Sequence, residues 1–217
     1  MDANGKGKRR GEEEEARPAV EGVEPEAAEE EEELIAAGPS VWRKVHVRIE
    51  GVSPLLMHKF PMVPIEALEK KDPAEQAEYA AYRDGDNQLF IPGQAVQRGL
   101  IGGAAYSKGK GRGSLARIAA ACLLVTPDQL LLGTTKYEVD ARPVVVPATK
   151  GRVLRYRPRL DKWACEFNLE WDERLLNETQ ARRIVDDLGA RVGLLDFRPE
   201  KRGPFGRFMV THWERVA

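Results

Sequence analysis

The stretch LFIPGQAVQRGLIGGAAYS, residues 89–107, is the most informative part of the chain for its fold. It predicts a short strand followed by a helix, because Pro92 and Gly93 separate an apolar run from a pattern at helical spacing. The buried positions of that helix are predicted to be Val96, Leu100 and Ala104. The helix also contains three glycines, and a glycine inside a helix costs about 1 kcal/mol relative to alanine. These are Gly99, Gly102 and Gly103, so we expect something to approach this helix backbone closely.

Alternating apolar and polar residues predict strands on both sides of this stretch. Before it, Val45, Val47 and Ile49 alternate with mostly basic side chains, which is the pattern of a half-buried strand. After it, residues 152–160, RVLRYRPRL, and residues 164–171, ACEFNLEW, alternate in the same way. Matching their apolar faces predicts an antiparallel hairpin with an even loop, either Asp161–Lys162 or Asp161–Ala164. This hairpin would place Arg155, Arg157 and Arg159 opposite Glu166, Asn168 and Glu170.

Three further helices are predicted from their N-caps, which are Asp72, Ser114 and Asn177. The last of them should end near Gly189 or Gly193, before a glycine-rich loop and a terminal strand. Residues 139–153 are broken by proline and glycine, which favours an extended arm over a regular element. The order of elements predicts an α+β fold, with a ferredoxin-like or RRM-like antiparallel sheet and helices on one face. The open face of such a sheet is a recurring RNA-binding platform.

The charge of the chain is divided between two parts. The net charge is −1, yet residues 1–40 hold 5 basic and 13 acidic side chains, which leaves 29 basic and 22 acidic in residues 41–217. The first part has almost no large apolar side chains, which predicts a disordered acidic tail. The second part is long enough for one domain and is basic. The tail as an internal competitor for the basic body is a hypothesis; plain solubilising disorder is the commoner role of such runs.

Several classes of protein are disfavoured by the sequence. The longest uncharged apolar stretch, Ile118–Pro127, has ten residues, whereas a membrane-spanning helix needs about 20. Cys122 and Cys165 stand alone, which predicts buried free thiols and a cytoplasmic protein rather than a zinc site. No nucleotide-binding or metal-ligand motif is present, so we expect no cofactor and no metal.

Two separated motifs point to nucleic acid. IPGQAVQRGL, residues 91–100, places a helix N-terminus with Gln94, Gln97 and Arg98 toward one edge, and RPEKRGPFGRF, residues 198–208, is a basic glycine loop. Helix N-termini and glycine loops both offer backbone N–H groups to phosphate, and flanking cations add affinity. The residues predicted to contact RNA are His58, Lys59, Gln94, Gln97, Arg98, Lys108, Lys110, Arg112, Lys150, Arg152, Arg155, Arg157, Arg198, Lys201, Arg202, Phe205 and Arg207.

Each of these signals also has a plainer interpretation. IPG before a helix is an ordinary strand-to-helix turn, and KGKGRG, residues 108–113, is compatible with a merely solvated loop. The arginines of residues 155–159 serve equally well as cross-strand partners of acidic residues. It is the combination of the two motifs that favours RNA binding.

Both motifs resemble those of the RAMP superfamily of CRISPR-associated proteins, particularly the backbone subunits of effector complexes. In that family an IPG motif opens the first helix of an RRM-like fold, and a glycine-rich loop precedes the last strand. Here Gln94 and Ala95 stand where the family has a pair of small hydroxyl residues. The resemblance implies a subunit that assembles in several copies along a guide RNA, with a hairpin or arm, residues 140–152, gripping RNA bound by a neighbouring copy.

The function expected from this resemblance is a non-catalytic ribonucleoprotein subunit in antiviral defence. Its partners would be guide RNA, a target DNA or RNA bound through base pairing, other copies of itself and other effector subunits, with no membrane. Phe205 or Met57 would wedge against bases. One alternative is a RAMP-type endoribonuclease that processes guide RNA and uses His58, although no partner for this histidine is visible in the sequence. Another is a guide-independent protein that binds single-stranded nucleic acid.

Overall fold

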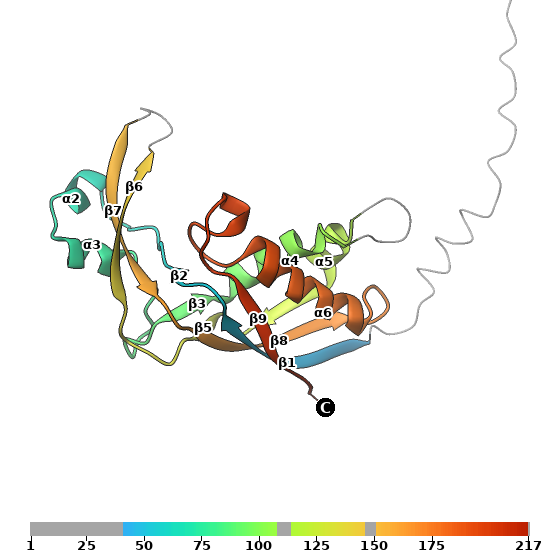
Figure 1. Ribbon diagram of the computed structural model, residues 1–217. Helices are drawn as coiled ribbons and strands as arrows, with labels where there is room; N and C mark the ends of the chain where they lie inside the picture. The colour runs from blue at the N-terminus through green and yellow to red at the C-terminus, as the bar shows by residue number, and fades with distance from the viewer. Residues whose placement is uncertain (1–40, 108–113, 146–150, 217) are drawn as a thin grey trace, which may run out of the picture. The chain divides into compact units, whose positions relative to one another are not determined.

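The computed structural model describes residues 41–107, 114–145 and 151–216. The predicted tail at residues 1–40, the loop with Lys108, Lys110 and Arg112, and Lys150 lie outside the described residues. A four-stranded antiparallel sheet has the order β4-β8-β1-β9 (Figure 1). Its strands are β1 (Trp42–Gly51), β4 (Leu123–Thr126), β8 (Ala164–Asp172) and β9 (Phe208–Arg215).

The helices complete a ferredoxin-like arrangement. Helices α4 (Gly93–Ala104) and α5 (Ala116–Cys122) connect β1 to β4, and α6 (Glu178–Asp187) connects β8 to β9. All three lie on the same face of the sheet (Figure 1). The chain therefore has the β-α-β-β-α-β order of this fold, with extra elements inserted. The predicted α+β class, antiparallel sheet and one-sided helices are confirmed.

The core lies between the helices and the apolar face of the sheet. Val47 pairs with Phe167, and Val45 pairs with Leu169, so the buried faces of β1 and β8 coincide. All four side chains are at most 1% exposed. The free thiols of Cys122 and Cys165 are buried as predicted, and burial raises their pKa values to about 11 and about 12.

The glycines of α4 allow another helix to approach it. A Cβ atom on Gly103 would lie 2.6 Å from the carbonyl oxygen of Ile184 in α6. A Cβ atom on Gly99 would lie 2.5 Å from a methyl group of Leu188, in the π-helical turn Leu188–Val192 that extends α6. The predicted close approach is confirmed, and the approaching group is the protein's own helix.

The arm is more regular than predicted. Strands β6 (Glu138–Val145) and β7 (Arg152–Leu160) form an antiparallel hairpin, and β2 (Leu55–Leu56) pairs with the base of β7. In Figure 1 this hairpin projects away from the four-stranded sheet. An arm in this region was expected, but its proline at position 143 is accommodated within a strand rather than breaking it.

The predicted hairpin between residues 152–160 and 164–171 is wrong. Strand β7 pairs with β6, whereas β8 pairs with β1 and β4. The linker 161–163 carries the chain from one sheet to the other, and Trp163 anchors it by donating its Nε1 hydrogen to the Ser53 carbonyl at 2.8 Å. The arginines of β7 consequently face Glu138, Asp140 and Arg142 of β6 rather than the acidic residues of β8.

The helix starts were predicted in two of three cases. The Asp72 side chain accepts from the Glu75 N–H at the start of α3 (Pro73–Tyr79), and Asn177 forms a full capping box with Gln180. Ser114 does not cap α5, which begins at Ala116 after Leu115. Leu115 is buried, and its N–H donates to the Ser107 carbonyl at 3.1 Å. The N-cap position therefore lies one residue later than predicted.

The remaining elements are short. They are α2 (Ile65–Glu69), the edge pair β3 (Phe90–Pro92) and β5 (Gln129–Leu131), and a 3-10 turn at Pro199–Lys201.

Candidate nucleic-acid interface

A cleft of about 590 Å³ lies where three parts of the chain meet, with Tyr82 added from the segment between α3 and β3. One wall is the first half of α4, the second is the segment after β2, and the third is the glycine loop between α6 and β9. The lining residues are His58, Tyr82, Ala95, Arg98, Gly99, Gly193, Leu195, Asp196, Arg198, Glu200 and Lys201. The two motifs found in the sequence therefore meet at one site.

Backbone hydrogen bonds join the glycine loop to the segment after β1. The Asp196 N–H donates to the Leu56 carbonyl at 3.0 Å, and the Gly206 N–H donates to the Pro54 carbonyl at 2.8 Å. Gly206 has a φ of 71°, a conformation that side-chain-bearing residues rarely adopt. A Cβ atom on Gly203 would overlap the Phe197 carbonyl group. These glycines are required by the tight path of the loop itself.

The glycine loop does not offer the backbone donors that the sequence suggested. The Gly203 N–H donates to Arg198, the Phe205 N–H to Phe197 and the Gly206 N–H to Pro54, all through backbone carbonyls. The start of α4 differs, because Pro92 provides no side-chain cap. The N–H groups of Gln94 and Ala95 lie in the first turn, where no intrahelical carbonyl can accept from them. The helix start, rather than the glycine loop, retains the character of an anion site.

Two cations of the cleft are free to meet phosphate. Arg98 on α4 is exposed, and Lys201 lies across from it on the glycine loop. Neither has an ion-pair partner within the part of the chain that the structure describes. Arg198 differs, since it is paired with Glu200 and also donates to the Leu195 carbonyl. Two of the three arginine and lysine side chains that line the cleft are thus unpaired within the described ranges.

A histidine and an aspartate form a pair at the cleft. His58 Nδ1 lies 3.4 Å from Asp196 Oδ2, and Asp196 also pairs with the buried guanidinium of Arg157. Burial alone would raise the pKa of Asp196, but the hydrogen bond with His58 and the charge of Arg157 outweigh it and lower this pKa to about 2. Asp196 is therefore charged at neutral pH. The partner that the sequence did not reveal for His58 is this carboxylate, 138 positions later in the chain.

Several predicted contact residues are occupied by structural roles. Gln97 does not share an edge with Arg98: it donates to the Leu123 carbonyl at 2.7 Å and accepts from the Val125 N–H at 3.0 Å, which ties α4 to β4. Arg157 is 5% exposed and paired with Asp196. Neither predicted wedge is accessible, because Phe205 is 3% exposed and Met57 is 0% exposed. The tight glycine loop folds Phe205 inward, under Arg142.

The other predicted residues do not line the cleft. Arg155 pairs with Glu69 at 3.5 Å, and Arg207 donates to the Ala190 carbonyl. Lys59, Gln94, Arg152 and Arg202 are exposed and lie outside the lining of the cleft. The structure brings together His58, Arg98, Arg198 and Lys201 out of the predicted set. Asp196 was missed, although it stands only two residues before the basic loop.

The open face of the sheet is filled with paired charges. Arg48 on β1 donates to Glu166 on β8 at 2.7 Å, and Lys44 lies 3.0 Å from Glu170. His46 lies between them, with its Nδ1 3.3 Å from the Asn168 Oδ1. An RRM-type platform stacks bases on aromatic rings at these central positions. Among the described residues at its centre, the rings of His46 and His212 lie 6.2 Å apart and are flanked by paired charges, whereas the cleft offers unpaired cations.

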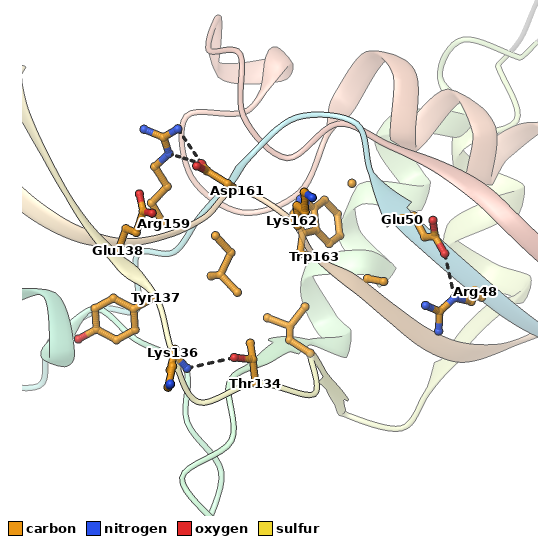
Figure 2. A pocket seen from close by; sticks show the side chains of 14 residues that line it. Arg48, Glu50, Thr134, Lys136, Tyr137, Glu138, Arg159, Asp161, Lys162 and Trp163 are labelled. Carbon is orange, nitrogen blue, oxygen red and sulfur yellow. Dashed lines mark hydrogen bonds and ion pairs between the residues drawn. The ribbon is translucent and has the colours of Figure 1, made fainter.

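A second hollow of about 800 Å³ lies at the base of the arm (Figure 2). Its walls include two ion pairs, Arg48 with Glu50 and Arg159 with Asp161, and Arg48 also pairs with Glu166 on the sheet face. Lys162 is an exposed cation of this hollow, without an ion-pair partner in the described ranges. None of the RNA-contact residues predicted within the described ranges lines it. Lys162 can therefore serve as a control for the unpaired cations of the cleft.

Comparison with known proteins finds likenesses among solved structures but none to a sequence family. No protein-family model matches the sequence. No curated protein matches it either. The fold is similar to a chain in the cryo-EM structure of the Type III-B Cmr-beta bound to cognate target RNA, with 12% sequence identity and a TM-score of 0.46. The match covers 91% of this chain and 68% of that chain. At this identity the likeness concerns the fold alone.

Two features are absent from the described residues. None of their helices has the length and apolar character needed to cross a membrane. Their histidine, cysteine and acidic side chains form no group of three or more that could hold a metal ion.

Proposed function

We propose that this protein is a non-catalytic RNA-binding subunit that holds the backbone of a single RNA strand in the cleft. The observation that carries the proposal is the meeting of Arg98, Lys201 and the uncapped start of α4 around one hollow. Unpaired cations and first-turn N–H groups recognise phosphate without reading the sequence of the bases. The two motifs that resemble the RAMP superfamily are the ones that build this cleft.

The finer parts of the proposal come from the resemblance. We infer that the strand is a guide RNA, that several copies of the chain assemble along it, and that base pairing selects a target DNA or RNA. The projecting β6–β7 hairpin supports this, because it supplies an arm of the kind that the family places on a neighbouring copy. Other effector subunits and a cytoplasmic role in antiviral defence belong to the same proposal.

A salt titration of RNA binding tests the cleft. Combining Arg98→Glu with Lys201→Glu is expected to weaken binding of a short oligouridine at least about 30-fold, and to reduce the salt slope by about 1.4, since each lost phosphate contact on a single strand removes about 0.7. Lys162→Glu is the matched control, an exposed cation in the other hollow whose reversal should change affinity less than about threefold. Affinity that is insensitive to salt, or equal losses in all variants, contradicts the proposal.

Sequencing of RNA that copurifies with the full chain tests the finer part. A guide binder should retain a discrete RNA species, whereas a guide-independent single-strand binder should retain a broad mixture. A broad mixture would contradict binding of a guide RNA but not the binding of RNA in the cleft.

The His58–Asp196 pair favours a second candidate function, cleavage of RNA. A histidine oriented by a carboxylate beside bound phosphate can act as a general base on a ribose 2′-hydroxyl, whose oxygen then attacks the adjacent phosphorus while the 5′-oxygen leaves. Incubating the wild-type protein with unstructured RNA decides the matter. If fragments appear and His58→Ala abolishes them while binding persists, this second function replaces the first. Intact RNA supports the non-catalytic proposal.

A further inference from the structure

Two large apolar side chains stand in solvent beside the cleft. Phe60 is 74% exposed and Met62 is 87% exposed. The prolines at positions 61 and 64 restrict the backbone around them, and the Lys59 N–H donates to the Ala80 carbonyl at 2.9 Å. The exposed side chains are therefore held on an anchored segment, which lowers the entropic cost of binding something to them.

Phe60 forms the rim of a slot of about 260 Å³. Apolar groups dominate the lining, which comprises His58, Lys59, Phe60, Pro61, Leu68, Gln76, Ala80, Arg155, Tyr156 and Arg157. Arg157 is 5% exposed, and its Nε atom has no hydrogen-bond partner among the described atoms. A buried donor left unsatisfied is costly, which points to a ligand that accepts from it. The slot thus has aromatic side chains in its wall and is lined by a residue with an unsatisfied buried donor.

We propose that this slot holds one unstacked nucleobase of the RNA whose phosphates lie in the cleft, with the Phe60 ring stacked on the base. This inference rests on the proposed function. His58 lines both the slot and the cleft, so the two hollows lie on either side of one side chain. Lys59 beside it has no ion-pair partner in the described part of the chain and can meet the intervening phosphate. A base has a flat π-face for Phe60, and its carbonyl oxygens or ring nitrogens can accept from Arg157.

A protein partner fits the observations less well. A single aromatic side chain buries about 150–250 Å², and a specific protein interface needs about 1,000 Å². Phe60 and Met62 alone fall well short of that area. Lys59 at the slot is moreover a cation without an ion-pair partner in the described ranges, which suits a polyanion, while Arg155 and Arg157 are paired with Glu69 and Asp196.

A pair of substitutions separates stacking in the slot from general stickiness of the segment. Met62 is more exposed than Phe60 but lines only the neighbouring hollow of about 330 Å³, not the slot. Phe60→Ala is expected to weaken binding of oligouridine about 5- to 150-fold, the effect of one lost base–aromatic stack. Met62→Ala should stay within about twofold, and Phe60→Trp should restore affinity and show quenched fluorescence on binding. The salt slope should remain that of the wild type, because no phosphate contact is lost.

An abasic oligomer of the same length completes the test. Phe60→Ala should not weaken binding of this ribose-phosphate chain, because no base remains to stack. Equal losses on oligouridine and on the abasic oligomer would overturn the inference, as would equal losses for Phe60→Ala and Met62→Ala, or a loss of self-association with RNA affinity intact. If Arg98→Glu weakens binding while Phe60→Ala does not, the slot fails and the proposed function stands. If neither variant changes affinity, both fail.

Discussion

The open sheet face and the cleft both carry basic side chains but differ in whether those side chains already have acidic partners. On the sheet face, Arg48 and Lys44 lie against Glu166 and Glu170 across the strands. At the cleft, Arg98 and Lys201 have no such partners among the described residues. A cation that is already paired must lose its partner before it meets phosphate, whereas a free cation only releases its counterion. Pairing, rather than the count of basic residues, distinguishes a binding surface from a solvated one.

The largest expected effect comes from altering the two regions in parallel. The Arg98→Glu and Lys201→Glu double variant should weaken RNA binding by at least about 30-fold. Lys44→Gln combined with Arg48→Gln removes as many cations from the sheet face and should change RNA affinity less than about twofold. Fluorescence anisotropy with one labelled oligouridine at several salt concentrations measures both. Comparable losses in the two double variants would show that the sheet face also binds RNA, and would break the distinction.

The next largest effect is on the stability of the fold, and it comes from Asp196, a partly buried residue of the cleft. Asp196 has a pKa of about 2, below the ordinary 3.8, so its charged form stabilises the fold above about pH 4 and this contribution is lost as the pH falls toward 2. Asp196→Asn should lower the free energy of unfolding by on the order of 2 kcal/mol at neutral pH. The difference from wild type should shrink between about pH 4 and pH 2 in urea titrations.

An exposed acid provides the control for that measurement. Asp161 pairs with Arg159 at the surface, with half of its side chain in solvent. Asp161→Asn should cost less than about 1 kcal/mol, because water screens such a pair. A pH-independent gap between Asp196→Asn and the wild type would mean that the aspartate acts through packing rather than charge.

Deleting residues 1–40 tests whether the acidic segment competes with RNA for the cleft. Removing its 13 acidic and 5 basic residues takes away a net charge of −8, so RNA affinity should stay unchanged or rise. The change should be largest at low salt. Anisotropy on the full chain and on residues 41–217 gives the comparison. Weaker binding after the deletion would assign the segment a direct contact with RNA.

Local features of the fold could be predicted from the sequence, because they depend on neighbouring residues. Pro92 and Gly93 do mark the junction of β3 and α4, and Asn177 does cap α6. The partner of β7 could not be predicted in this way. Its alternation fits β8 as well as β6, and the choice depends on β1, which offers β8 a longer apolar face more than 100 positions earlier in the chain.

The candidate site shows the same limit. The basic character of the α4 start and of the glycine loop is visible in the sequence, and both line the cleft. The sequence does not show which of those side chains are already in use. Gln97 is bound to β4, and Phe205 is folded inward by glycines whose backbone path depends on Phe197 and Leu194. Phe60 could have been predicted as a contact residue, because it is an aromatic residue between a lysine and a proline in an apolar segment broken by prolines.

The smallest expected effect is the change in stability when a paired cation of the sheet face is replaced. Lys44 lies 3.0 Å from Glu170 but keeps 41% of its side chain exposed. Lys44→Gln should change the free energy of unfolding by less than about 1 kcal/mol, and the difference should disappear at high salt. Urea unfolding at low and high salt measures it, with Arg98→Gln as the matched cleft variant. Arg98 has no protein partner to lose among the described residues. Arg98→Gln should therefore leave the free energy of unfolding unchanged at both salt concentrations while still weakening RNA binding. A stability loss for Arg98→Gln as large as that for Lys44→Gln would mean that the cleft cation is also engaged within the protein, and the contrast between paired and free charges would no longer explain where RNA binds.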